Sequence, residues 1–128
     1  MITFVQQIFF VCGTLFGALA IAAGAFGSHY LKNKLSQEDL GIFEVAVRYQ
    51  MYHALALIAL AAFLSWYSSK WMIASGWCWV LGTIIFSGSL YILVFSGVRA
   101  WGAVTPVGGI LLLAGWGLLV LAALFLRS

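Results

Sequence analysis

The chain has 128 residues, of which 65% are hydrophobic and 7% are charged, whereas an ordinary globular domain has about 25% charged residues. Its formal net charge of +3 comes from six Lys and Arg residues spread along the chain, without the basic block that is typical of nucleic-acid-binding tails. This composition excludes an ordinary soluble domain and a nucleic-acid-binding protein, and it predicts a single integral membrane domain over residues 1–128.

The first apolar segment, residues 4–26, is long enough to cross a bilayer, because about 20 helical residues span a hydrocarbon core of about 30 Å. The triplet Ala-Ile-Ala at residues 20–22 imitates a signal-peptidase site. No Lys or Arg precedes the apolar run, however, and the run continues past that site. We therefore expect a first helix that is retained.

Small residues recur along this first segment at a spacing that brings helices close together. Gly13 and Gly17 form a GxxxG pair, and Ala20 with Gly24 is a further pair of the same spacing. We expect this face to pack against another helix of the same chain, and a dimer interface is the alternative.

The main hydrophilic stretch of the chain follows the first span. In it Ser36 and Asp39 resemble a helix-capping box, with Asp in place of the usual Glu or Gln, so a helix should start near Gln37. We expect an amphipathic helix over residues 37–48 at the membrane interface. This helix either continues straight into the second span or bends near its end.

Three further apolar segments predict spans over residues 49–66, 72–95 and 105–126. Aromatic residues beside Lys70 mark the boundary between the second and third spans, as in the aromatic belts of membrane proteins. The predicted fold is an all-α integral membrane four-helix bundle, with an interfacial amphipathic helix between the first and second spans.

The two cysteines, Cys12 and Cys78, lie in apolar segments without CxxC spacing or a nearby His, so we expect no metal site. If the helices alternate in direction, each cysteine lies about 9 to 12 Å from the same membrane face. That position permits a disulfide without implying one.

Basic residues in the short loops indicate the orientation. On one side of the membrane the loops carry Lys32, Lys34, Arg48 and Arg99, and the other side carries Lys70 and Arg127. This excess predicts that the first and third loops face the cytoplasm and that both termini face outward.

Four antiparallel spans place most polar residues in one half of the membrane, near the first and third loops. Polar groups are expensive inside a membrane unless they are paired, so we expect residues from all four helices or their ends to meet there. The candidate site residues are His29, Glu44, Arg48, Tyr49, Gln50, His53, Ser87, Ser89, Tyr91, Arg99 and Thr105.

Three interpretations of these residues remain open. In the first they form a hydrogen-bonded network that stabilises the bundle, with Glu44 paired to Arg48 and Arg99 bonded to helix-end carbonyls. In the second they are the polar end of a site for a lipid, a quinone or another apolar small molecule. In the third they serve catalysis or a cofactor, with His29 and His53 as paired axial ligands of a haem.

Catalytic motifs are absent from the sequence. It has no Ser-His-acid order, no HExxH motif and no Gly-rich phosphate loop. We therefore expect a protein that is not an enzyme, with no catalytic residue and no cofactor.

Four blocks carry a resemblance to a known family: GAFGSHYLKNKL (24–35), FEVAVRYQMYHALAL (43–57), FSGSLY (86–91) and GAVTPVGG (102–109). In this order they resemble the small membrane family called domain of unknown function 423, which includes bacterial YgdD-like and YwdK-like proteins and is similar to transmembrane protein 256 of animals. Ser28 departs from the family pattern, where Ala is common. The resemblance implies a four-span protein of the bacterial inner membrane, and it implies no established catalytic residue.

These observations together predict a non-enzymatic accessory, assembly or lipid-interacting membrane protein. A binding or transport module for a small apolar or amphipathic molecule is the alternative, with a haem protein after it. We expect membrane lipids as partners, and we leave open a homo-oligomer or a larger membrane complex.

Overall fold

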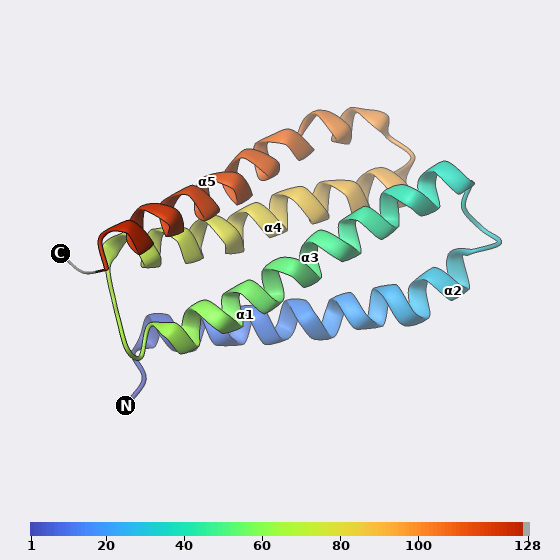
Figure 1. The fold of residues 1–128 in the computed structure, drawn as a ribbon. Coiled ribbons are helices and arrows are strands. Elements are labelled where there is room, and N and C mark those ends of the chain that lie inside the picture. Colours follow the sequence, from blue (N-terminus) through green and yellow to red (C-terminus); the bar gives the residue numbers. More distant parts are fainter. Residues whose placement is uncertain (127–128) are drawn as a thin grey trace.

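The computed structural model describes residues 1–126, and within them the chain forms helices and connecting turns without a strand (Figure 1). The long helices are α1 (Phe4–Ile21), α3 (Gln37–Phe63), α4 (Lys70–Ser96) and α5 (Thr105–Leu124). Three short elements join them: a π-helix η1 (Ala22–Gly27), α2 (Ser28–Leu31) and a 3-10 helix η2 (Arg99–Ala103). Among the described residues, four helical stretches are long and apolar enough to cross a membrane, which confirms the predicted four-helix membrane bundle.

Helices that follow one another in the chain lie side by side in space. Helix α1 continues through η1 and α2 as one helical stretch and packs on α3, which packs on α4, which in turn packs on α5 (Figure 1). The N-terminus, the end of α5 and residues 64–69 lie at one end of the bundle, the terminal end (Figure 1). Residues 32–36 and 97–104 lie at the other end, the loop end.

Side-chain caps mark the starts of α1, α3 and α4, and a glycine ends α4. Thr3 caps α1 in a reciprocal capping box with Gln6, and Ser69 accepts from the Met72 backbone N–H at the start of α4. Ser36 accepts from the Asp39 backbone N–H at 3.1 Å, so α3 begins at Gln37 as predicted. Gly97 ends α4 in the left-handed conformation at φ 72°, which favours Gly because it has no Cβ.

Residues 37–48 are continuous with the helix of the second span, which is one of the two predicted alternatives. They are the first turns of α3, an uninterrupted helix of 27 residues that is about 40 Å long and exceeds a hydrocarbon core of about 30 Å. The sequence changes from polar to apolar along α3, but no Pro interrupts the backbone hydrogen bonds. The straight continuation into the second span, which the sequence left open, is therefore the one observed, and the helix ends at Phe63.

The GxxxG face of α1 packs within the chain, as expected. A Cβ atom added to Gly13 would lie 2.9 Å from the Ala54 carbonyl oxygen and 2.9 Å from Ile58 Cγ1. A Cβ on Gly24 would lie 3.1 Å from Val47. Helices α1 and α3 can approach this closely only because these positions carry no larger side chain.

The largest buried cluster lies toward the terminal end and centres on Phe9, Leu57, Met72, Trp79 and Leu112. A second, smaller cluster at the loop end contains Leu31, Phe43, Leu93 and Val94. The two cysteines are free thiols.

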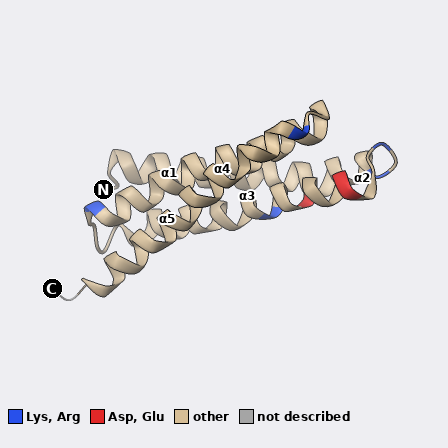
Figure 2. Ribbon diagram, turned by 90° about the horizontal axis from the view of Figure 1, so that it is seen from above, with Lys and Arg blue, Asp and Glu red and all other residues tan. Residues whose placement is uncertain are grey.

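Charged residues are unevenly distributed between the two ends. Most of the Lys, Arg, Asp and Glu residues gather at the loop end, and Lys70 lies at the terminal end (Figure 2). Arg127, which contributed to the predicted orientation, lies outside the described residues.

Candidate functional site

Gln50 is the polar junction of three helices. Its side chain is 6% exposed. Its Nε2 donates to the Phe16 carbonyl on α1 at 2.9 Å, and its Oε1 accepts from the Tyr91 hydroxyl on α4 at 2.8 Å. The amide therefore pairs both of its ends inside the bundle, which removes the cost of burying it.

Two serines of α4 connect it to the helices on either side. Ser87 donates to the Ala46 carbonyl on α3 at 2.7 Å. The hydroxyls of Ser89 and Thr105, the first residue of α5, lie 2.6 Å apart. Together with Gln50 these contacts link all four spans.

His53 lies deeper in the bundle and uses both of its ring nitrogens. Its Nδ1 lies 2.8 Å from the Tyr49 carbonyl, and Trp116 Nε1 of α5 lies 3.1 Å from its Nε2. An indole N–H only donates, so Nε2 is the acceptor and Nδ1 carries the proton. The hydrogen-bond network thus assigns a neutral imidazole.

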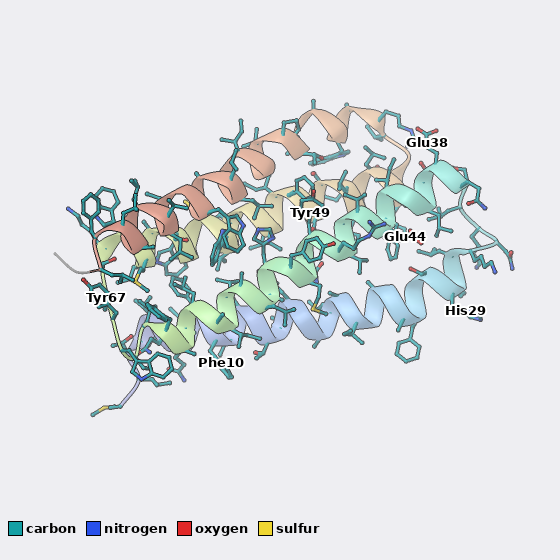
Figure 3. The ribbon with its side chains drawn as sticks, in the orientation of Figure 1. Phe10, His29, Glu38, Glu44, Tyr49 and Tyr67 are labelled. Atoms are coloured by element: carbon teal, nitrogen blue, oxygen red, sulfur yellow. The ribbon has the colours of Figure 1, made fainter. Side chains whose placement is uncertain are left out.

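His29 does not join this group. It is exposed on α2 at the loop end (Figure 3), whereas His53 lies about 24 Å along α3 from Gln37, at 1.5 Å per residue. Both nitrogens of His53 are also already bonded. The structure therefore contradicts the paired haem ligands that the sequence left open.

The charged candidates lie at the periphery. Glu44 and Arg48 form the predicted i, i+4 pair at 3.7 Å, but both side chains are at least half exposed. Arg99 does not bond helix-end carbonyls as expected. Its Nη1 donates to the Asp39 carboxylate at 2.7 Å, because η2 places it beside the first turn of α3.

The structure also contains polar contacts that the sequence analysis missed. Gln6 donates to the Ala61 carbonyl at 3.0 Å and to the Ser65 hydroxyl at 2.8 Å. Ser75 donates to the Gly115 carbonyl at 2.6 Å. These pairs lie toward the terminal end, so buried polar contacts are not confined to one half of the membrane. The sequence signal that could have predicted the first of these contacts is Gln6, an amide side chain within an apolar span.

An apolar groove separates α3 from α5. In the described part of the chain no Cα atom of α3 lies within 8 Å of a Cα atom of α5, although Trp116 bonds to His53 across the gap. The groove between the two helices has a volume of about 320 Å³. We call it the α3–α5 groove. Its main lining residues are Ala56, Ala59, Leu60 and Phe63 of α3, Met72 and Trp79 of α4, and Trp116, Leu119, Ala122 and Ala123 of α5.

A second groove lies between α1 and α4, which diverge toward the loop end. It has a volume of about 500 Å³. We call it the α1–α4 groove. Its lining residues are Leu19, Ala23, Gly27, Tyr30 and Leu31 on one side, Phe43 and Gln50 of α3, and Tyr91 and Phe95 of α4.

A hydrogen-bonded pair of residues lies at the inner limit of each groove. Gln50 and Tyr91 line the α1–α4 groove and bond to each other. Trp116 lines the α3–α5 groove and bonds to His53. The grooves therefore open toward opposite ends of the bundle, and hydrogen-bonded pairs lie between them.

Comparison with known proteins places the chain in a family. Residues 23–109 match the model of the family described as protein of unknown function (DUF423). A UPF0382 membrane protein of Staphylococcus saprophyticus is 44% identical over 118 residues, which cover 91% of this chain and 96% of the relative. The UPF0382 inner membrane protein YgdD of Escherichia coli is 40% identical over 111 residues, 87% of this chain and 85% of the relative.

No solved structure gives a significant match. The family match covers more than half of the chain, includes His29, Gln50, His53 and Thr105, and agrees with the four membrane-spanning helices. The chain therefore belongs to the DUF423 family of small membrane proteins.

Proposed function

We propose that this protein is a non-enzymatic, lipid-interacting protein of the bacterial inner membrane that accommodates one hydrocarbon chain in the α3–α5 groove. The inner-membrane location follows from the similarity to the Escherichia coli inner membrane protein YgdD. The observation that carries the proposal is the groove itself, whose described lining is apolar throughout except for two indole rings.

The shape of the groove suits a single chain. Its volume of about 320 Å³ lies at the lower end of the range of about 300 to 1,000 Å³ for small-molecule pockets. Small alanines on both rims, among them Ala59 and Ala123, leave room between α3 and α5. Since the rims face the bilayer, a lipid chain reaches the groove without crossing water.

The pairing of His53 supports the non-enzymatic part of the proposal. A general base or a metal ligand needs a ring nitrogen that is free to act, and in His53 one nitrogen donates to Tyr49 while the other accepts from Trp116. This arrangement joins α3 to α5 where the groove ends. We assign His53 a structural role, in setting the width of the groove.

A lipid carrying a diazirine midway along one acyl chain tests the proposal in membranes. Photolysis followed by mass spectrometry should label the groove residues Phe63, Met72 and Leu119. Ala123→Phe should fill the groove and remove this labelling. Ala114→Phe is the matched control, because Ala114 is exposed on the same helix and nine residues of helix turn by about half a circle.

The outcomes are distinct. Labelling that is spread evenly over the outward faces of all four helices, or that falls equally in both variants, would show that the groove has no preference for a chain. A protein that co-purifies with the wild type and is lost in Ala123→Phe would instead assign the groove to an assembly partner.

A further inference from the structure

The α1–α4 groove differs from the α3–α5 groove because a cation stands at its mouth. Lys34 Nζ donates to the hydroxyl of Tyr30 and lies 4.0 Å from the centre of its ring. Tyr30 lines the groove. An ammonium group and a phenol hydroxyl therefore lie together at the loop end of the apolar walls.

This end of the bundle carries uncompensated positive charge. Arg99 is paired with Asp39 and Arg48 with Glu44. Lys32 and Lys34 are then balanced by Glu38 alone among the charged residues of the loop end. An anion at the groove mouth would restore the balance, and a juxtamembrane Lys attracts an anionic lipid headgroup.

The wall of the groove contains an irregular helix. Ala23 and Gly27 line the groove and belong to η1, the π-helical segment Ala22–Gly27. π-helical turns are rare and frequently occur at functional sites. A Cβ added to Gly27 would lie 3.3 Å from Phe43 Cζ, so a larger residue would narrow the groove here.

The length of the groove matches one leaflet. From Tyr30 to Leu19 the wall extends about 16 Å at 1.5 Å per residue, and half of a hydrocarbon core of about 30 Å is about 15 Å. The groove ends at Gln50 and Tyr91, whose side chains bond to each other. It therefore accepts an acyl chain from the surface to about the bilayer centre.

We propose that the α1–α4 groove binds an anionic glycerophospholipid, with the phosphate on the Lys34 ammonium and the Tyr30 hydroxyl and one acyl chain lying along the η1 wall. Binding replaces the Lys34 to Tyr30 hydrogen bond with two bonds to phosphate oxygens. Lipids without net charge have the same kind of acyl chain, but they lack the net negative charge that Lys32 and Lys34 would attract.

Native mass spectrometry of the purified full-length protein tests this site. The probes are phosphatidylglycerol and phosphatidylcholine with identical acyl chains. Wild-type protein should retain phosphatidylglycerol preferentially, and Lys34→Gln should weaken that binding about fivefold, the effect of one juxtamembrane Lys. Lys70→Gln is the matched control, since Lys70 also lies over an aromatic ring, 5.2 Å from the centre of Trp71, but at the terminal end.

A second pair of variants tests whether the acyl chain lies against the apolar wall of the α1–α4 groove, independently of the Lys34 charge. Leu19 and Ile21 are 53% and 57% exposed on the same helix, but of the two only Leu19 lines the groove. Leu19→Trp should reduce phosphatidylglycerol retention, whereas Ile21→Trp should not. Because both side chains already face outward, both variants should fold.

Equal retention of the two lipids by the wild type would overturn the proposal, as would equal losses in Lys34→Gln and Lys70→Gln. Loss in Lys34→Gln without loss in Leu19→Trp would reduce the site to a surface charge and refute a chain in the groove. Ala123→Phe, which fills the other groove, should leave the preference unchanged, so this proposal and the α3–α5 proposal fail independently.

Discussion

Trp116 on α5 donates its indole N–H to Nε2 of His53 on α3 at 3.1 Å, across a gap where the described Cα atoms of the two helices stay more than 8 Å apart. The bond fixes the protonation of the imidazole and joins the outer helix to the centre of the bundle. It also lies at the inner limit of the α3–α5 groove.

Trp116→Phe should destabilise the bundle by about 1 kcal/mol, because it keeps an aromatic ring but leaves the buried His53 Nε2 without its donor. Thermal unfolding in detergent measures the change. Trp66→Phe is the control, since Trp66 is 78% exposed and its indole N–H donates to no buried acceptor in the described structure. Equal shifts in both variants would show that the Trp116 to His53 bond contributes no stability.

Gly108→Ala should destabilise the protein by about 1 to 3 kcal/mol, the usual cost of overpacking. Its added Cβ would lie 2.4 Å from the Phe86 backbone N, which no rotamer change relieves. Gly117→Ala on the same helix meets nothing within 4 Å and should be neutral or slightly stabilising. Similar unfolding curves for the two variants would contradict the close approach of α4 and α5.

Thr83→Val should cost little or increase stability. Thr83 is 3% exposed, and in the described structure its hydroxyl makes no hydrogen bond, so the change removes an unpaired polar atom while keeping the shape of the side chain. Ser87→Ala provides the comparison, because it removes the bond to the Ala46 carbonyl and should cost about 1 kcal/mol. A larger loss for Thr83→Val would reveal a partner of the hydroxyl.

Local sequence patterns correctly predicted those features that depend only on residues close together in the sequence. Apolar length predicted the four membrane-spanning helices, and Ser36 predicted the start of α3. The spacing of Gly13 and Gly17 predicted a close helix contact, and the structure supplies Ala54 and Ile58 as its partners.

The same patterns were insufficient where the outcome depends on distant residues. The change from polar to apolar residues left open whether the helix that begins near Gln37 bends before the second span or continues straight into it, and the structure shows that α3 continues straight. Arg99 pairs with Asp39 rather than with helix-end carbonyls. A side chain chooses among several nearby partners, and only the positions of η2 and α3 decide which one is within reach.

The sequence by itself determined that this is a four-span membrane protein with its charge at one end, because hydropathy and length act on each segment separately. Only the tertiary structure decided which polar groups meet and where the bundle stays open. The crossing of α1 against α4 and the separation of α3 from α5 leave the two grooves. Such gaps arise from the relative placement of whole helices, which no single segment encodes.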